Sequence, residues 1–278
     1  MVNLLTMSPE FQSGIKIAII IVAVLAFLYL LLGLVFFNLA LGRKKRKDPT
    51  QPAHDSLFER NKTNEHLIAG YKWFDETYHQ NVSIKNRKGK NLHAVEFRNP
   101  SNSDVWVVCL QGWTNMTREM SAYADEFYKR GFNVLIPELR GHQNSEYSFV
   151  TMGWNDRLDV VDWIENIVEE IPKSKIIIMG VSMGGATTMM TTGEKLPENV
   201  MLAIEDCGFS GVKDILVDQS KRAYKMPPWL IVPPTNLFIE FSTVSFSAKV
   251  QRLSSSKKAL HQQCLFTEIK MTLFFQAI

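Results

Sequence analysis

Cysteine is scarce in this chain, with 3 among 278 residues. The three, Cys109, Cys207 and Cys264, lie far apart, and none forms a C-x-x-C pair or stands at ligand spacing from histidines. Disulfide-stapled secreted domains and structural zinc sites both need more cysteines at closer spacing. The sequence therefore favours neither class.

The chain also lacks a strong net charge, because its formal charge at pH 7 is only +3. Much of the positive excess sits in one run, Arg43-Lys44-Lys45-Arg46-Lys47. A face that follows a phosphate backbone needs basic residues spread over its length. We therefore expect no nucleic-acid partner. The 46% hydrophobic content is instead enough for one large domain with an apolar core.

Charged residues are absent altogether from Ile17 to Gly42. This run is longer than the roughly 20 residues that a helix needs to cross a bilayer. It is also longer than the apolar part of a signal peptide, which is about 7 to 15 residues. We expect a short tail at residues 1–14 and a transmembrane helix at residues 15–41. The basic run that follows predicts a cytoplasmic domain and contact of residues 15–47 with the lipid bilayer.

The rest of the chain shows an alternation of strand and helix patterns. A basic juxtamembrane segment and linker at 42–61 precedes a domain at 62–256. Two runs around a turn, Val82 to Lys85 and Leu92 to Arg98, predict an antiparallel hairpin. Short apolar runs typical of buried parallel strands follow at 105–110, 133–137, 175–179 and 200–204, with helical patterns at 116–129, 154–170 and 183–194. The predicted fold class is α/β, a mostly parallel, doubly wound sheet entered by a hairpin.

Residues 211–246 interrupt this alternation. They contain Pro227, Pro228, Pro233 and Pro234 and many apolar side chains. An inserted segment of this kind would suit a lid over a site. The apolar side chains of this segment are compatible with a hydrophobic substrate. They are equally compatible with a lid whose apolar side chains pack against one another.

The motif most closely tied to chemistry is Gly180-Val181-Ser182-Met183-Gly184, which matches G-x-S-x-G. An apolar strand leads into it and a helix pattern follows, as a sharp strand-to-helix turn requires. Such a turn strains the middle residue, and only glycines beside it avoid clashes. Ser182 is therefore the candidate nucleophile, with a turn serine as the structural alternative.

Two backbone amides are candidates for an oxyanion hole. The helix that begins at Met183 aims its first amides at the position of a developing oxyanion. A second donor is expected from the loop after an earlier strand. The segment Leu110-Gln111-Gly112-Trp113 has that place, which makes the amide of Trp113 the candidate.

With these motifs in order, the chain resembles the α/β-hydrolase superfamily, in particular membrane-anchored bacterial hydrolases of the cell-surface type. The resemblance covers about 92–250 and implies the α/β-hydrolase fold. Gln111 stands where such proteins have histidine, and Gln143 where they have glycine. The resembling segments are Gln111-Gly112-Trp113, Glu138-Leu139-Arg140-Gly141-His142, Met152-Gly153-Trp154, Gly180-Val181-Ser182-Met183-Gly184 and Ile204-Glu205-Asp206-Cys207-Gly208.

The resemblance implies a serine hydrolase that acts on a small-molecule or peptide ester, thioester or amide through an acyl-enzyme on Ser182. This reaction needs no metal and no organic cofactor, and we expect neither. The resemblance also suggests a domain at the cell surface, whereas the charge rule predicts the cytoplasm. Two other functions stay open. One is a membrane-tethered binding protein that keeps the fold without catalysis, and the other is an acyltransferase.

A serine of this fold needs an acid and a histidine base that follow it in the chain. After Ser182 the only histidine is His261, in a polar stretch with no strand before it, so it is a poor candidate for the base. Asp206 is a candidate acid, although a loop-capping carboxylate is the preferred interpretation. We expect His142 to pack a loop and the earlier histidines to lie on the surface; these are His54, His66, His79 and His93.

The tail at 257–278 suggests why the partners are missing. Back-translation of residues 264–278 in a shifted frame permits FIHGDKDDFIFPSN, a hydrophobic run followed by His-Gly-x-x-Asp. This product resembles the family's next strand and acid loop. We therefore expect a frameshift near residues 256–260, a C-terminally incomplete fold and little or no activity in the chain as given.

Overall fold

The computed structural model describes residues 8–43, 65–113, 116–209 and 211–242. Two compact units are distinguished, residues 1–40 with 215–247 and residues 41–214 with 248–278, and each is described by itself. Most of the expected linker, the whole expected out-of-frame tail and the residues His54, His261 and Cys264 lie outside the described residues.

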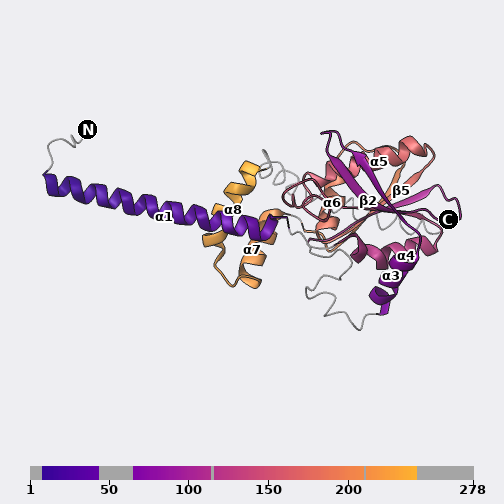
Figure 1. Cartoon of the computed structure of the whole chain (residues 1–278), viewed down its shortest axis with the longest axis horizontal. Coiled ribbons are helices and arrows are strands. Elements are labelled where there is room, and N and C mark those ends of the chain that lie inside the picture. Colours follow the sequence, from indigo (N-terminus) through magenta and orange to yellow (C-terminus); the bar gives the residue numbers. More distant parts are fainter. Residues whose placement is uncertain (1–7, 44–64, 114–115, 210, 243–278) are drawn as a thin grey trace. The chain divides into compact units, whose positions relative to one another are not determined.

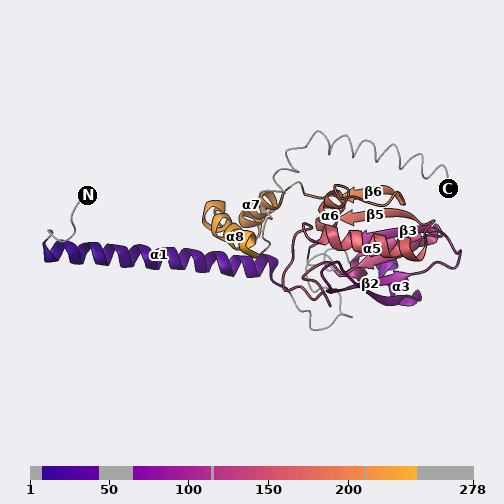
Figure 2. The same cartoon turned by 90° about the horizontal axis from the view of Figure 1, so that it is seen from above.

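The larger unit contains a six-stranded mixed sheet (Figure 2). Its strand order is β1-β2-β4-β3-β5-β6. The β1 and β2 hairpin is antiparallel, β2 pairs antiparallel with β4, and the remaining pairs are parallel. The predicted α/β-hydrolase fold is therefore confirmed. The strands are β1 (Gln80–Lys85), β2 (Asn91–Phe97), β3 (Val105–Leu110), β4 (Asn133–Pro137), β5 (Lys175–Val181) and β6 (Val200–Asp206).

Helices cover both faces of the sheet, with α3 and α4 on one side and α5 on the other (Figure 1). The predicted helix at 116–129 consists of a 3-10 turn, Thr117–Met120, that leads into α4 (Ser121–Lys129). The other predicted helices are α5 (Asp156–Glu170) and α6 (Met183–Thr191). One helix, α3 (Glu65–Glu76), was not predicted. Its EHLIAGYKWFDE sequence buries only Gly70 and Phe74, so its apolar signal is weak.

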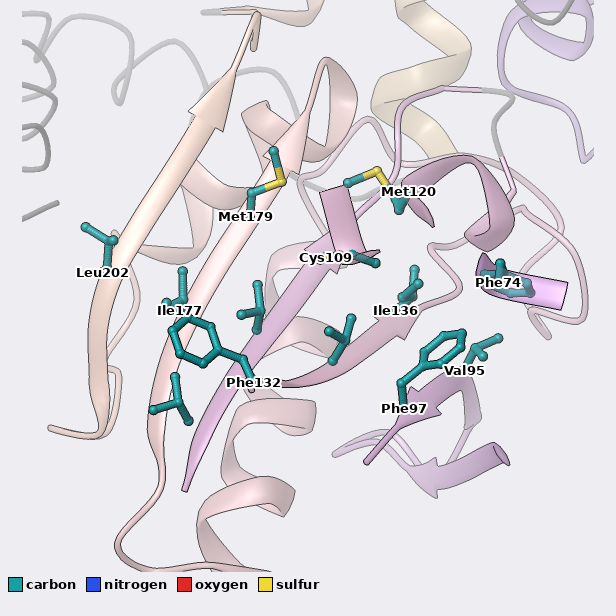
Figure 3. Packing of buried hydrophobic residues seen from close by; sticks show 14 residues of the cluster. Phe74, Val95, Phe97, Cys109, Met120, Phe132, Ile136, Ile177, Met179 and Leu202 are labelled. Atoms are coloured by element: carbon teal, nitrogen blue, oxygen red, sulfur yellow. The ribbon is translucent and has the colours of Figure 1, made fainter. Parts of the chain in front are cut away.

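A hydrophobic core fills the space between the sheet and the α3 and α4 side (Figure 3). Every residue of β3 is buried, as a central parallel strand covered on both faces requires. Val107 and Cys109 belong to this core, and Cys109 is completely buried. Cys207 is exposed, and neither cysteine forms a disulfide within the described residues.

The smaller unit contains α1 (Pro9–Leu41) and most of the expected lid segment. Among the described residues, α1 is the one helix that is long and apolar enough to cross a membrane, and a signal sequence would meet the same criterion. It begins at Pro9, earlier than the predicted residue 15. The expected lid segment is helical up to residue 242, with α7 (Val212–Arg222) and α8 (Pro228–Ser242).

Candidate active site

Ser182 occupies the turn between β5 and α6. β5 ends at Val181 and α6 begins at Met183, so a single residue reverses the direction of the chain. Its backbone has φ 55° and ψ −111°, a combination that costs a non-glycine residue about 1–3 kcal/mol. Ser182 is half-buried, and its amide donates to the carbonyl of Asp206 at 2.8 Å. The next strand thus helps to hold the strained residue in place.

The two glycines of the motif are needed for close packing. A side chain at Gly180 would overlap the backbone of Gly184. A side chain at Gly184 would overlap the carbonyl groups of Leu110 and Gln111. The first turn of α6 therefore lies directly against the end of β3, where the loop to Trp113 begins.

This contact brings the two candidate oxyanion donors to the same end of the sheet. The first amides of a helix have no partner within the helix, and Met183 is the first residue of α6. Trp113 is half-buried and follows the end of β3 by three residues. Gln111 directly follows β3 and is completely buried. Neither polar atom of its side chain has a hydrogen-bond partner among the described residues.

Asp206 lies at the end of β6, next to the Ser182 turn. Its carboxylate accepts a hydrogen bond from the Tyr123 hydroxyl at 2.8 Å, while its carbonyl accepts the Ser182 amide. Burial, together with this hydrogen bond, raises the pKa of Tyr123 to about 12. Asp206 thus links β6 to α4 and to the candidate nucleophile. Tyr123 was not anticipated, because nothing in the sequence around it distinguishes it from other helical tyrosines.

The described histidines do not complete a triad with Ser182. Of the described histidines, His79 places its Nδ1 2.9 Å from the Thr77 carbonyl and His142 places its Nδ1 3.0 Å from the Arg140 carbonyl, so both of these nitrogens bond away from Ser182. His66 is exposed, whereas His79 and His93 are half-buried and so lie only partly at the surface. His79 packs its ring against Phe97, with centroids 5.0 Å apart, because the hairpin directs it toward the α3 side of the core.

His142 is buried in the loop after β4, where its Nδ1 lies 3.0 Å from the Arg140 carbonyl. Burial lowers the pKa of His142 below its ordinary value, against the opposing effect of the Asp156 charge. The environment thus favours a neutral imidazole. This position agrees with the predicted loop-packing role.

A buried polar network joins two of the segments that carry the family resemblance. The Arg140 guanidinium makes two hydrogen bonds to the Asp159 carboxylate, at 2.5 and 2.8 Å, and both side chains are almost completely buried. Asp156 accepts the amide of Arg140 at 2.7 Å and the amide of Gly153 at 3.1 Å. Asn86, in the turn of the hairpin, donates to Asp159 at 2.9 Å.

These bonds fix the loops after β4 and before α5 to the start of α5. Gly153 in turn lies against α6, because a side chain there would come within 2.8 Å of the Thr187 hydroxyl. The network therefore supports the helix that follows Ser182. Sequence reasoning did not single out Asp156 and Asp159. Within the described ranges, no group of three His, Cys, Asp or Glu side chains is placed to hold a metal ion.

Comparison with known proteins identifies relatives of the same fold. A sequence profile described as "alpha/beta hydrolase fold" matches residues 105–231. The uncharacterized protein YqkD of Bacillus subtilis is 23% identical over 212 residues, which are 75% of this chain and 66% of that protein. A thermostable monoacylglycerol lipase of a Bacillus species is 29% identical over 93 residues, which are 32% of this chain and 35% of that protein. The chain thus spans less than two thirds of each curated relative.

Among solved structures, an esterase of Pyrococcus furiosus superposes with a TM-score of 0.50 and 20% identity over 72% of each chain. At this identity the likeness concerns the fold alone. It agrees with the strand order of the sheet and with the residues that the profile matches. The chain therefore has the α/β-hydrolase fold, and the profile match at residues 105–231 supports its assignment to the α/β-hydrolase superfamily.

Proposed function

We propose that the chain is a membrane-anchored serine hydrolase in which Ser182 is the nucleophile. The observation that carries this proposal is the strained turn at Ser182, placed between a central parallel strand and the N-terminus of α6. A serine is not needed to make such a turn, and glycine would adopt φ 55° at lower cost. A reactive hydroxyl at the carboxyl edge of the sheet accounts for the strain.

In the proposed reaction, the Ser182 hydroxyl attacks the carbonyl carbon of an ester, thioester or amide and loses its proton to a base. The amides of Met183 and Trp113 would donate to the resulting oxyanion. Collapse of the tetrahedral intermediate expels the alcohol, thiol or amine, which takes up the proton, and leaves an acyl-enzyme. Water then attacks the acyl group by the same steps and releases the acid.

The base and its carboxylate are proposed to lie outside the described residues. The acid would come from the acid loop that the shifted reading frame permits, and the histidine base would follow it, in the chain order Ser, acid, His. Asp206 is bound to Tyr123, which supports a loop-capping role for its carboxylate rather than the acid role.

A binding protein without catalysis is the second candidate, because the Nδ1 atoms of His79 and His142 bond to the Thr77 and Arg140 carbonyls and not to Ser182. An acyltransferase would form the same acyl-enzyme and transfer the acyl group to an alcohol or amine instead of water. The monoacylglycerol lipase among the relatives supports hydrolysis of carboxylic esters. The two reactions are distinguished by adding an alcohol or amine acceptor and measuring whether an acylated acceptor forms in place of the free acid.

Membrane attachment is proposed from α1, whose most apolar 18-residue window has a mean hydropathy of 3.1 and is only 11% buried. A soluble core helix of this composition would be mostly buried. The basic run at 43–47 favours a cytoplasmic domain, whereas the family resemblance favours the cell surface. We therefore propose the membrane anchor only, and a protease-protection experiment decides on which side of the membrane the hydrolase domain lies.

Turnover of p-nitrophenyl esters and of a thioester analogue tests the proposed reaction. The full chain in detergent is compared with a form whose reading frame is restored after residue 254, each with its Ser182→Ala variant. We expect turnover by the restored form, abolished by Ser182→Ala, and little or none by the chain as given. Folded proteins that show no turnover in either form would contradict the hydrolase and favour the binding protein.

A further inference from the structure

The starting point is the position of α8 along α1. The Tyr29 hydroxyl donates to the Trp229 carbonyl at 3.3 Å. A side chain at Gly33 would come within 2.6 Å of the Pro234 carbonyl carbon. Phe37 and Phe238 lie with ring centroids 6.4 Å apart. α8 therefore packs along the part of α1 from residue 29 to residue 37, as both views show (Figures 1 and 2).

The length of α1 places this contact inside the bilayer. The charged residue that precedes the apolar run is Lys16, so only 12 residues, 17–28, precede the first contact with α8. At about 1.5 Å per residue they extend roughly 18 Å, whereas the hydrocarbon core is about 30 Å thick. If α1 spans the membrane from Lys16 onward, the span continues to about Phe36. The residues that contact α8 then lie within the bilayer or at its boundary.

The composition of α8 matches that position. No charged residue occurs from Met226 to Ile239, a stretch of 14 residues that is too short to cross the hydrocarbon core. Ile231, Val232 and Ile239 are buried in the unit. On the outer surface, Trp229 is 71% exposed and Leu237 is 39% exposed. An apolar helix with an exposed tryptophan and too short to span is typical of interfacial membrane helices.

The residues before α8 supply the charge that such a helix needs at the headgroups. Lys221 and Arg222 end α7, and Lys225 follows in the connection to α8. All three are exposed. Trp229 comes four residues after Lys225 in the chain, where an aromatic side chain would sit at the boundary between headgroups and acyl chains.

We propose that α8 is a second membrane-embedded element, which lies in the interfacial layer of the leaflet that holds the C-terminal half of α1. Trp229 and Leu237 face lipid, and Lys221, Arg222 and Lys225 face the headgroups. The inference rests on the proposed membrane anchor and adds a second bilayer contact to it. The segment predicted as a lid is then a membrane-binding segment.

Depth-dependent fluorescence quenching tests this placement. The full chain carries Cys207→Ser and Cys264→Ser, and Cys109 is shielded by complete burial. An environment-sensitive nitrobenzoxadiazole probe is attached to Trp229→Cys or Leu237→Cys in vesicles of phosphatidylcholine and phosphatidylglycerol. Leu25→Cys, in the apolar run of α1, and Lys88→Cys, in the exposed hairpin turn, are the two references.

We expect lipids with a doxyl group near the headgroup to quench the probes at 229 and 237. Lipids with a deep doxyl group should quench the probe at 25, and neither should quench the probe at 88. If 229 and 237 stay unquenched while 25 is quenched, α8 is not in the bilayer, although the anchor stands. If the probe at residue 25 is also unquenched, α1 is not in the bilayer, and both the membrane anchor and this proposal are contradicted. Circular dichroism of each variant verifies that the fold is kept.

Discussion

Single residues at the end of the sheet show how the candidate site is held. Ser182 has an unfavourable backbone conformation, and two residues that hydrogen-bond to its amide and its carbonyl restrain it. Its amide bonds to Asp206, its carbonyl accepts the amide of Ala186 at 2.9 Å, and Asp206 is tied to Tyr123. The side chain that would react is therefore on a rigid support, as preorganised catalysis requires.

His142 provides a prediction about pH at the residue scale. Its pKa in the folded protein is below the ordinary value of about 6.5, so the unfolded chain binds more protons as the pH falls through that value. Acidification from about pH 8 to pH 5 should therefore reduce the free energy of unfolding of the wild type more than that of His142→Gln. Urea unfolding at several pH values measures the difference. The exposed His66→Gln variant should follow the wild type, and parallel curves for wild type and His142→Gln would contradict the buried neutral imidazole.

The residues of the site were predictable to different degrees. Ser182, Met183 and Trp113 follow from a motif and from the order of strands, because an edge of parallel strands collects the residues that come after them. Tyr123 and the half-buried His79 did not follow, since their environment is created by elements far away in the sequence. Contacts between residues that are distant in the chain leave no local pattern in the sequence.

At the scale of elements, the Ser182 turn depends on how closely α6 approaches β3. Gly184→Ala would place a methyl group on the carbonyls of Leu110 and Gln111. We expect it to lower the free energy of unfolding by about 1–3 kcal/mol or more, as overpacking of a rigid backbone does. Gly14→Ala is the matched control, because no atom lies within 4 Å of its added carbon. Equal stability of the two variants would mean that the close approach is absent.

The Arg140 and Asp159 pair fastens the loop after β4 to α5. Asp159→Asn removes the partner charge and leaves a buried guanidinium, which should cost about 3–5 kcal/mol in urea unfolding. Glu126→Gln is the control, because its pair with Arg130 is about half-exposed and its loss should cost less than about 1 kcal/mol. A cost for Asp159→Asn as small as that of the control would show that the network does not stabilise the fold.

The strands and most helices were predictable because their patterns are local. Continuous apolar runs such as 175–179 are typical of strands buried on both faces, and the structure contains a strand at each of the four. α3 was not predicted because it buries little of its surface. The pairing of Arg140 with Asp159 requires the three-dimensional fold, since the two residues lie on different elements.

At the scale of the whole molecule, the proposed anchor determines how the chain is extracted from membranes. We expect the full chain to remain in the membrane pellet after alkaline carbonate treatment and to enter the soluble fraction only with detergent. Protease added to sealed vesicles then reports the side on which residues 65–209 lie. Release of the full chain by carbonate would contradict a spanning α1.

The central claim, that Ser182 is an activated nucleophile, is tested most directly by labelling with a fluorophosphonate probe and mapping the adduct by mass spectrometry. The chain as given and the form with its frame restored after residue 254 are compared, each with a Ser182→Ala control. The account predicts an adduct on Ser182 in the restored form, much less in the chain as given, and none in either control. Folded proteins in which Ser182 stays unlabelled in both forms would contradict the claim.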